Sequence, residues 1–346
     1  MERIHVKVPG EQLQDREYMK QALALAEKGH GWVNPNPMVG AVLVKDGRII
    51  GEGYHTRYGQ LHAEREAFKN AAERGEETAG ADLYVTLEPC CHTGKQPPCT
   101  EAVLASGVKR VIVGCTDPNP VVAGRGIRLL REKGLEVVAG VLRGECERQN
   151  EVFFHFMRTK LPFTGLKYAM TLDGKTATVS GKSQWITGEA ARKRVHEDRG
   201  RYMAILTGVS TVLADNPQLT CRIPGGKNPI RVIADTKLRT PLSSTVVQTA
   251  RETPTWIVTA VSDAGRKKAY EDAGCRVLSV PANEGELDLQ AMMQRLGEEK
   301  VDSVMVESGG TLAWSFLKAG LVNRGQAYIA PKIFGGAGAP PPVRGT

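Results

Sequence analysis

The chain has 346 residues, of which 41% are hydrophobic and 24% are charged, and this length and composition favour a globular protein of two domains. Its formal net charge of +8 is compatible with nucleic acid or with anionic small molecules, because the basic residues are spread along the chain and form no tail. The amino terminus, MERIHVKVPGEQ, lacks the apolar core of a secretory signal, and no apolar run reaches the roughly 20 residues of a membrane span. Seven scattered cysteines favour a reducing compartment, so we expect a cytoplasmic protein with no membrane partner.

The first half of the chain alternates between helical and extended patterns. Residues 15–29 have apolar residues at helical spacing, and residues 39–55 read as two strands joined by the hairpin turn Asp46-Gly47. The alternation continues with helices expected at 62–75, 99–107 and 126–134, and with strands expected at 82–88, 109–115 and 135–140. This order predicts an α/β sandwich with a largely parallel region.

The pattern restarts after one expected helix at 144–160 and Pro162, which places a domain boundary near 145–160. We take residues 1–147 as the first domain and residues 148–346 as the second. Strands of the second domain are expected at 163–177, 202–208, 229–235, 255–260, 275–280, 302–310 and 324–330, with helical patterns between most of them.

The segment EPCCHTGKQPPCTE, at residues 88–101, carries the clearest chemical signal. Zinc deaminases of bases have the pattern His-x-Glu followed by Pro-Cys and a second cysteine, and the glutamate moves protons without binding the metal. Here the pattern is matched by His62, Glu64 and Cys90. Cys99 opens a helix after two prolines, where the helix dipole and the metal both favour a thiolate, so it is the natural third ligand.

The two cysteine ligands are separated by eight residues, more than the general pattern has. The insertion carries His92 and Lys95, and we interpret His92 as a substrate contact. Cys91 should point away from Cys90 in an extended segment and is interpreted as a bystander. A structural zinc knuckle is the alternative, but such a site normally has four protein ligands and has no use for Glu64. His5, His30 and His55 are expected at the surface or in loops.

The second domain contains ESGGTL, which at a strand end entering a helix would offer amides to a phosphate. The standard dinucleotide fingerprint G-x-G-x-x-G is absent, so the residues alone predict only a dinucleotide-type α/β domain.

Taken together, these motifs resemble the bifunctional deaminase–reductases of riboflavin biosynthesis. The resemblance rests on NPNPMVGAVLV, HAEREA and LEPCCHTGKQPPC in the first domain, and on LKYAMTLDGKTA, SGKSQWIT, TVLADNPQLTCR and VESGGTLAWSFL in the second. It implies a cytidine-deaminase-like three-layer domain followed by a dihydrofolate-reductase-like α/β domain. The implied substrate is a phosphorylated pyrimidine, 2,5-diamino-6-ribosylamino-4(3H)-pyrimidinone 5′-phosphate. It is deaminated with Zn²⁺, and its ribosyl chain is then reduced to ribityl with NADPH.

The resemblance also assigns residues. It implies His62, Cys90 and Cys99 as zinc ligands, Glu64 as the proton shuttle, Asn36 as a substrate contact, and His92 and Lys95 as partners of the ribose phosphate. The implied NADPH contacts are Ala169, Trp185, Thr211, Asp215, Thr236, Gly309, Gly310, Thr311 and Leu312. The implied substrate contacts of the reductase are Ser183, Arg199, Leu219, Arg222 and Glu307, with the two arginines as phosphate partners. Lys167 and Asp215 are further candidates for assisting the opening or protonation of the sugar.

Three other readings stay open at this point. The chain stops at APPPVRGT, where the family continues for about another strand pair, so the second domain could be truncated or could be a nucleotide-binding domain without reductase activity. A degenerate, non-enzymatic paralogue is a further reading, against which the intact zinc motif argues. A nucleic-acid adenosine or cytidine deaminase is disfavoured by the long gap between the cysteines and by only 5% aromatic residues. We therefore expect no nucleic-acid partner, and the resemblance implies a homo-oligomer formed through the reductase domain.

Overall fold

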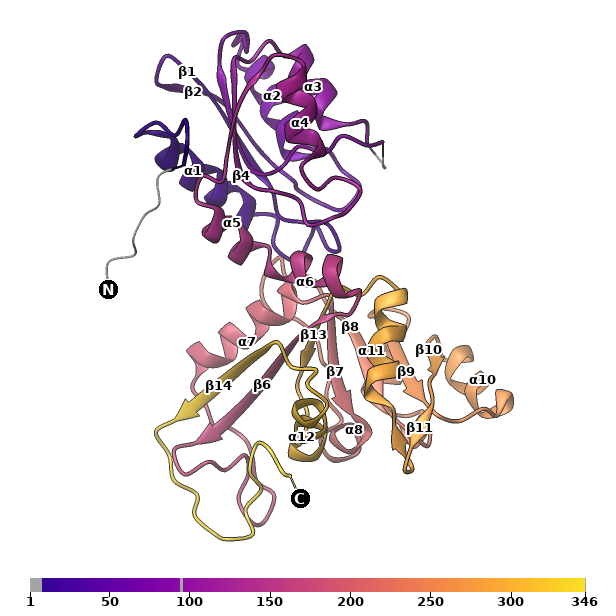
Figure 1. The fold of residues 1–346 in the computed structure, drawn as a ribbon. Helices are drawn as coiled ribbons and strands as arrows, with labels where there is room; N and C mark the ends of the chain where they lie inside the picture. The colour runs from indigo at the N-terminus through magenta and orange to yellow at the C-terminus, as the bar shows by residue number, and fades with distance from the viewer. Residues whose placement is uncertain (1–7, 94–95, 346) are drawn as a thin grey trace. The chain divides into compact units, whose positions relative to one another are not determined.

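The computed structural model describes residues 8–93 and 96–345, and internal contacts divide the chain into two compact units, residues 1–159 and 160–346 (Figure 1). The expected boundary between residues 147 and 148 falls inside helix α5 (Arg143–Gln149). Helix α6 (Glu151–Thr159) also lies in the first unit.

The first unit contains a five-stranded sheet with the order β2-β1-β3-β4-β5. Its strands are β1 (Gly40–Lys45), β2 (Arg48–Tyr54), β3 (Asp82–Leu87), β4 (Arg110–Cys115) and β5 (Glu136–Ala139). β1 is antiparallel to both β2 and β3, and β3, β4 and β5 are parallel. The predicted hairpin turn is confirmed, because Asp46 and Gly47 both have positive φ, as a two-residue hairpin loop of this type requires.

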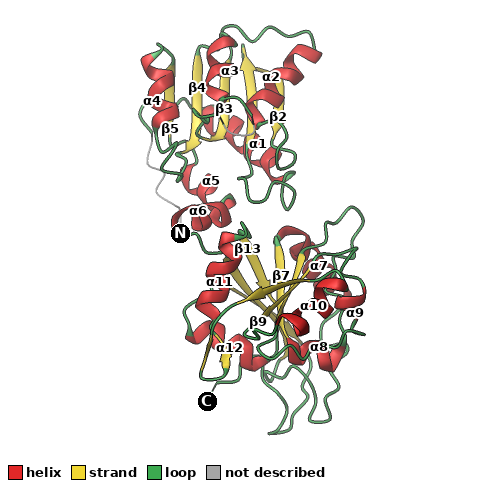
Figure 2. Ribbon diagram, turned by 90° about the vertical axis from the view of Figure 1, so that its right-hand side faces the viewer, coloured by secondary structure: helices red, strands yellow, loops and turns green. Residues whose placement is uncertain are grey.

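Helices cover both faces of this sheet, and alternate residues of each strand supply two separate cores (Figure 2). One core joins Leu43, Leu83 and Val111 to helices α2 (Ala63–Glu73), α3 (Cys99–Ala105) and α4 (Arg125–Glu132). The other joins Val42 and Tyr84 to helix α1 (Asp15–Glu27) and to α5 and α6. The unit therefore has the expected three layers.

The single helix expected at 144–160 is wrong, because the chain forms two helices separated at Asn150. Asn150 leaves the helical conformation, and its buried side-chain amide bonds both backbone polar groups of Met38 at 2.8 Å. An asparagine can satisfy a distant backbone segment in this way, which competes with continuous helix.

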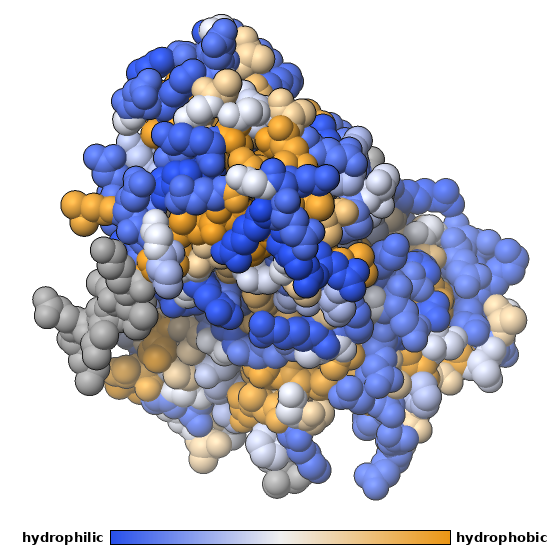
Figure 3. Space-filling view, turned by 45° about the horizontal axis from the view of Figure 1, so that its top comes forward, coloured by the Kyte–Doolittle hydropathy of each residue, from blue (hydrophilic) through white to orange (hydrophobic). Residues whose placement is uncertain are grey.

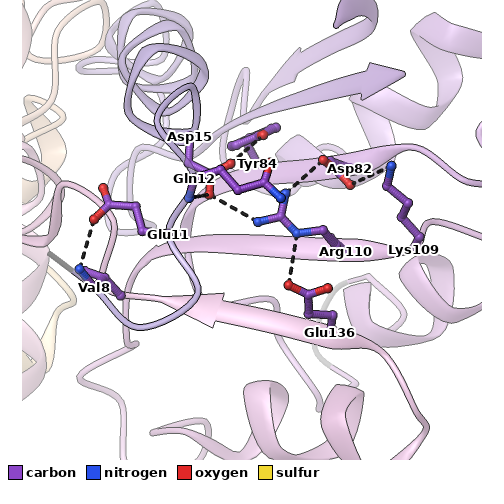
Figure 4. Close-up of polar contacts among 9 residues, drawn as sticks. All are labelled: Val8, Glu11, Gln12, Asp15, Asp82, Tyr84, Lys109, Arg110 and Glu136. Atoms are coloured by element: carbon purple, nitrogen blue, oxygen red, sulfur yellow. Dashed lines mark hydrogen bonds and ion pairs between the residues drawn. The ribbon is translucent and has the colours of Figure 1, made fainter. Parts of the chain in front are cut away.

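Arg110 forms a buried ion network that joins the sheet to α1 (Figure 4). Its guanidinium pairs with Asp15 at 3.2 Å, Asp82 at 3.0 Å and Glu136 at 3.1 Å. Asp15 is fully buried and also accepts a hydrogen bond from the Tyr84 hydroxyl at 2.8 Å. A buried carboxylate needs such partners, so the network ties the start of α1 to β3 and β4.

The second unit contains a seven-stranded sheet with the order β10-β9-β8-β7-β13-β6-β14, and every described pair in it is parallel. Its strands are β6 (Phe163–Thr171), β7 (Ala204–Gly208), β8 (Ile230–Ala234), β9 (Thr255–Thr259), β10 (Arg276–Ser279), β13 (Ser303–Val306) and β14 (Arg324–Ala330). Two short strands, β11 (Ala282–Asn283) and β12 (Glu286–Leu287), form a separate hairpin. The seven strands expected from sequence are all present.

Helices again lie on both faces (Figure 2). Leu206 and Val232 pack with α11 (Leu289–Glu298) and α12 (Gly310–Lys318) on one face. Ile205 and Ile233 pack on the other face with α8 (Val209–Asp215), α9 (Thr245–Gln248) and α10 (Ala264–Asp272). Helix α7 (Glu189–Arg201) precedes β7. This alternation confirms the α/β organisation expected of the second domain.

Among the described residues, no helix has the length and apolar character needed to cross a membrane. Figure 3 shows one face of the surface, where hydrophilic residues predominate and hydrophobic residues are exposed in separate patches.

Candidate functional site

The predicted metal ligands meet where β3 ends and two helices begin. His62 immediately precedes α2, Cys90 follows β3, and Cys99 is the first residue of α3. His62 Nδ1 lies 3.6 Å from the Cys90 sulfur and 3.3 Å from the Cys99 sulfur. The three ligand atoms all lie within 4.8 Å of one another.

This donor set fits a zinc ion. Two thiolates and one imidazole at metal–ligand distances of about 2.0–2.3 Å would be separated by about the distances seen here, and three protein ligands leave a fourth position open. Hydrogen bonding by Cys99, and then by His62, lowers the pKa of Cys90 to about 4, so Cys90 is a thiolate at neutral pH. Cys91 is not a member of the cluster, in agreement with its interpretation as a bystander.

Glu64 lies in the first turn of α2, two residues after His62, and only 3% of it is exposed. Burial raises the pKa of its carboxyl group, and a bound metal cation would act in the opposite direction. A buried carboxyl beside the ligands, yet not among them, is placed to carry protons.

Asn36 is hydrogen-bonded to His55, whose ring centre lies 5.4 Å from that of the ligand His62. His55 lies in the loop after β2 and outside the ligand cluster, as expected, but it is buried, with only 2% exposed. Its Nδ1 lies 2.9 Å from the Leu61 carbonyl, which makes Nδ1 the donor and leaves Nε2 to accept from the Asn36 amide at 3.2 Å. Burial lowers the pKa of His55, so the neutral ring fixes which way Asn36 points. No sequence pattern indicated this contact.

Glu88 anchors the segment that carries Cys90. The buried carboxylate accepts backbone hydrogen bonds from Asp117, Gly124, Gly126 and Ile127 at 2.8–3.2 Å. Helix α4 comes so close that a side chain at Gly126 would lie 2.1 Å from the Pro89 carbonyl oxygen. The start of α4 and the Pro89-Cys90 turn are therefore locked together.

The segment between the cysteines is described only in part. His92 is exposed, and its proximity acts to lower the pKa of the buried Asp117, although burial raises that pKa overall to about 6. Gln96 donates to the Gly59 carbonyl at 3.1 Å and so ties the segment to the chain ahead of α2. The predicted phosphate partner Lys95 lies outside the described residues.

Two adjoining cavities in the second unit collect most of the predicted cofactor residues. The larger, about 600 Å³, is lined among others by Thr211, Asp215, Thr236 and the turn 309–312. The smaller, about 380 Å³, is lined by Lys167, Ala169, Ser183 and Glu307 and shares Thr211, Asp215 and Gly309 with the larger.

The start of α12 faces both cavities. Gly309 precedes the helix, and a side chain there would meet nothing within 4 Å. Gly310 has the opposite constraint, since a side chain would lie 2.9 Å from the Pro341 carbonyl oxygen. Free amides at the start of a nine-residue helix, open to a cavity, suit the phosphates of a dinucleotide.

Glu307 organises the charges of the smaller cavity. Its carboxylate accepts from Lys167 at 2.9 Å and from Arg199 at 2.7 and 3.0 Å. Although burial acts to raise the pKa of this carboxyl group, the two cations lower it to about 2. Arg199 is consequently paired inside the protein and also donates to the Thr220 carbonyl at 3.1 Å.

Four predicted residues of the second unit line neither of these two cavities: Arg199, which is bonded to Glu307 behind the smaller one, and Trp185, Leu219 and Arg222. Trp185 lines a separate cavity of about 540 Å³, where it stacks under Arg192 with the guanidinium 4.7 Å from the ring centre. Leu219 is buried and Arg222 is exposed, and neither lines the cofactor cavities.

Sequence reasoning missed several residues that line the two cavities. They are Tyr168, Thr176, Ala177, Gly181, Arg239, Glu286, Pro340, Pro341 and Arg344. Tyr168, Thr176 and Ala177 lie within the quoted motif LKYAMTLDGKTA and Gly181 lies within SGKSQWIT, so a signal existed for them. Glu286 lies on the short strand β12, and Arg239, Pro340, Pro341 and Arg344 come from loops brought in by tertiary packing.

Comparison with known families is consistent with this geometry. Residues 12–115 match the cytidine and deoxycytidylate deaminase zinc-binding region, and residues 162–346 match the RibD C-terminal domain.

Similarity to single proteins extends over nearly the whole chain. The riboflavin biosynthesis protein RibD of Actinobacillus pleuropneumoniae is 50% identical over 331 residues, which is 96% of this chain and 87% of that protein. Its Escherichia coli counterpart is 43% identical over 93% of this chain and 89% of that protein. A Thermotoga maritima crystal structure of a diaminohydroxyphosphoribosylaminopyrimidine deaminase/5-amino-6-(5-phosphoribosylamino)uracil reductase aligns with a TM-score of 0.84 at 42% identity, covering 93% of this chain and 88% of that one. Acinetobacter baumannii RibD aligns with a TM-score of 0.85 at 37% identity, covering 96% and 91%.

Proposed function

The chain belongs to the RibD family of riboflavin biosynthesis proteins, and on that premise we propose how its residues divide two successive reactions. The protein is a bifunctional deaminase and reductase of riboflavin biosynthesis, with a zinc-binding deaminase unit and a reductase unit. The substrate proposed is 2,5-diamino-6-ribosylamino-4(3H)-pyrimidinone 5′-phosphate. The observation that carries the proposal is the His62, Cys90 and Cys99 triangle with Glu64 beside it, in a chain whose other unit has a dinucleotide-sized cavity.

In the deaminase unit, His62, Cys90 and Cys99 would hold the zinc ion. Zinc held by such ligands supplies Lewis acidity, which makes water a usable nucleophile near neutral pH. Glu64 would carry the two protons of the attacking water in turn, the first to the ring nitrogen and the second to the amino group, which departs as ammonia. Its position in the first turn of α2 keeps the carboxyl group at a fixed distance from the His62 ligand.

Asn36 orients the pyrimidine in this unit, with its amide fixed by His55. His92, and Lys95 beyond the described residues, are proposed to bind the ribose phosphate, because cations are the ordinary partners of phosphate in proteins.

In the reductase unit, the larger cavity is proposed to bind NADPH through Thr211, Asp215, Thr236 and the turn 309–312, with Ala169 contacting it from the smaller cavity, and NADPH supplies the hydride. The support is the shared lining of the two cavities, which would bring the cofactor against a substrate held in the smaller one. Trp185 would have to turn from its separate cavity to contact NADPH.

Lys167 and Ser183 face the substrate in the smaller cavity, together with Glu307. The Lys167 ammonium, held at 2.9 Å from Glu307, is proposed to hydrogen-bond the sugar oxygen as the ring opens. Arg199 acts behind Glu307, while Leu219 and the exposed Arg222 are proposed to meet the phosphorylated end of the substrate.

One experiment tests both halves: the purified, zinc-loaded chain is incubated with the diaminopyrimidinone ribotide, with and without NADPH. We expect ammonia release in both samples and NADPH oxidation only after deamination. Absence of ammonia would refute the deaminase assignment, and ammonia without NADPH oxidation would refute the reductase assignment.

Two further properties are proposed from the family resemblance. We expect a homo-oligomer formed through the reductase unit, which light scattering of the full chain measures. A cytoplasmic location is supported by the seven cysteines, all of which are free thiols. A nucleic-acid deaminase is not favoured, since the reductase unit has no part in such an activity.

A further inference from the structure

Arg231, on β8, is the largest side chain that is completely buried in the described chain. Its guanidinium has no carboxylate partner among the described residues and is held by oxygens of other kinds. It donates to Thr249 Oγ1 at 2.8 Å, to the Thr249 carbonyl at 3.0 Å and to the Thr253 carbonyl at 2.7 Å. The fourth bond, at 3.2 Å, goes to the carbonyl of Gln218. Burying an arginine without a counter-ion costs free energy, which its four hydrogen bonds offset only in part. A residue kept at this cost points to a role for the groups that it binds.

The fourth bond leads to the segment 216–222, which we call the substrate loop. Asn216 and Leu219 both have positive φ, of 40° and 53°, although neither is a glycine. Left-handed backbone of this kind persists only where the surroundings hold it. The substrate loop therefore depends on its anchors for its conformation.

Two arginines anchor the carbonyls on either side of Leu219. Arg231 binds the Gln218 carbonyl from the interior, and Arg199 binds the Thr220 carbonyl at 3.1 Å while its other nitrogens pair with Glu307 of the smaller cavity. The Gln218 carbonyl is thus bonded to the core, and the Thr220 carbonyl is bonded to the arginine that pairs with Glu307.

Other hydrogen bonds hold the ends of the loop, among them one from the Arg222 backbone N–H to His196 Nδ1 at 3.2 Å. Thr245 donates its backbone N–H to Asn216 Oδ1 at 2.8 Å, and Cys221 donates its backbone N–H to Asn228 Oδ1 at 2.9 Å. Only Arg231 joins the middle of the loop to the interior of the sheet, among the bonds that the described residues make.

We propose that Arg231 is a positioning residue of the reductase: through the Gln218 carbonyl it fixes the substrate loop and so places Leu219 and Arg222 for the phosphorylated pyrimidine. The inference rests on the proposed substrate contacts of that loop. Arg231 itself touches neither substrate nor cofactor, since it is completely buried. The proposed NADPH contacts lie outside the loop, on β6 (Ala169), on α8 (Thr211 and Asp215), just after β8 (Thr236) and at the start of α12, so losing Arg231 should affect the two ligands unequally.

The test measures the reductase reaction of the full, zinc-loaded chain with 5-amino-6-(5-phosphoribosylamino)uracil and NADPH. For Arg231→Met we expect KM for the pyrimidine to rise about tenfold or more, with KM for NADPH changed less than about twofold. Arg231→Lys should show a smaller rise, because one ammonium cannot span the carbonyls that the guanidinium joins. Deaminase activity of the same preparation is the internal control.

Arg251→Met is the matched control. Arg251 also binds a carbonyl, that of Asp272 at 2.7 Å, but it is exposed and makes no contact with the substrate loop. We expect both KM values to stay at those of the unchanged protein.

A merely structural role for Arg231 would lower the number of active sites and leave both KM values unchanged, and this result would overturn the proposal. An equal rise in both KM values would overturn it as well. If Arg231→Met does not fold, amide hydrogen exchange of Arg231→Lys tests the proposal. Faster exchange of the amides in 216–222, with the exchange of β13 unchanged, supports the proposal. Unchanged exchange in 216–222 refutes it.

Arg222→Ala separates this inference from the proposed function. An unchanged KM for the pyrimidine in Arg222→Ala would remove Arg222 from the substrate site, whatever Arg231→Met shows. A raised KM in Arg222→Ala together with an unchanged KM in Arg231→Met would refute the positioning role alone.

Discussion

Glu64 of the first unit and Glu307 of the second are both buried in functional sites, yet their pKa values shift in opposite directions. Burial raises the pKa of Glu64, whose nearest ionisable neighbours are the thiols and the imidazole of the metal ligands. The pKa of Glu307 falls to about 2, because Lys167 and Arg199 lie within hydrogen-bond distance and outweigh the effect of burial.

The difference shows that partners decide what a buried carboxyl group does. Glu64 has no lysine or arginine ion pair among the described residues, so its proton affinity is set by the metal ligands and by the zinc that they would hold, which suits a proton carrier. Held between two cations, Glu307 stays ionised at every physiological pH and acts as a fixed charge that orients its neighbours. The two units thus use the same residue type for opposite purposes.

The largest expected effect comes from Glu64→Gln. We expect the deaminase rate to fall by about 10²–10⁴-fold, because the amide cannot carry a proton, while reductase activity stays unchanged. Ammonia release and NADPH oxidation on one preparation measure the two rates. Zinc content, determined by atomic absorption, should be unchanged, and its loss would show that Glu64 binds the metal and is no proton carrier.

Arg110→Met tests a third buried charge cluster, in which the carboxylates depend on one cation. Removing Arg110 leaves the fully buried Asp15 without its counter-ion, so we expect the free energy of unfolding of the first unit to fall by about 3–5 kcal/mol. Denaturant unfolding followed by deaminase activity measures this loss. Retention of full stability would mean that the network in Figure 4 orients α1 without stabilising it.

The pH dependence of stability distinguishes Glu307 from an ordinary carboxyl group. Its folded-state pKa of about 2 lies below the ordinary value of 4.5, so its contribution is complete above pH 4.5 and is lost as the pH falls toward 2. The second unit should therefore lose stability steeply in this window, whereas Glu307→Gln should be less stable at neutral pH and less sensitive to acid. Equal pH slopes for the two proteins, measured by urea unfolding, would contradict the assigned ion pairs.

The smallest expected effect is that of Glu136→Gln. Glu136 pairs with the same guanidinium as Asp15, but its side chain is 59% exposed. Water screens such a pair, so we expect a loss below about 1 kcal/mol in the free energy of unfolding. A loss as large as that of Arg110→Met would show that the burial of an ion pair does not determine how much it contributes to the free energy of unfolding.

Much of the fold followed from local signals in the sequence. The Asp46-Gly47 hairpin, the strand–helix alternation and the helix starts at His62 and Cys99 depend on neighbouring residues, and the structure has them. The helix expected at 144–160 failed because a distant backbone segment at Met38 captures the Asn150 side chain.

The metal ligands were predictable because His62, Cys90 and Cys99 each stand at a recognisable end of a helix or strand, where chain direction determines where a side chain points. The role of His55 was not, since its contacts with Asn36 and Leu61 depend on the path of a loop. Lining residues such as Arg239 and Pro341 were likewise supplied by loops remote in sequence.

The sequence by itself determined the two α/β units and the residues placed to hold a metal ion, because hydrophobic periodicity, turn chemistry and ligand spacing are local properties. Only the tertiary structure decided how buried charges are paired. Glu64 and Glu307 look alike in the sequence, as do Arg199, Arg222 and Arg231. The pKa values of the two glutamates and the exposures of the three arginines differ because electrostatic energy in a protein interior depends on which groups the fold brings within a few ångströms.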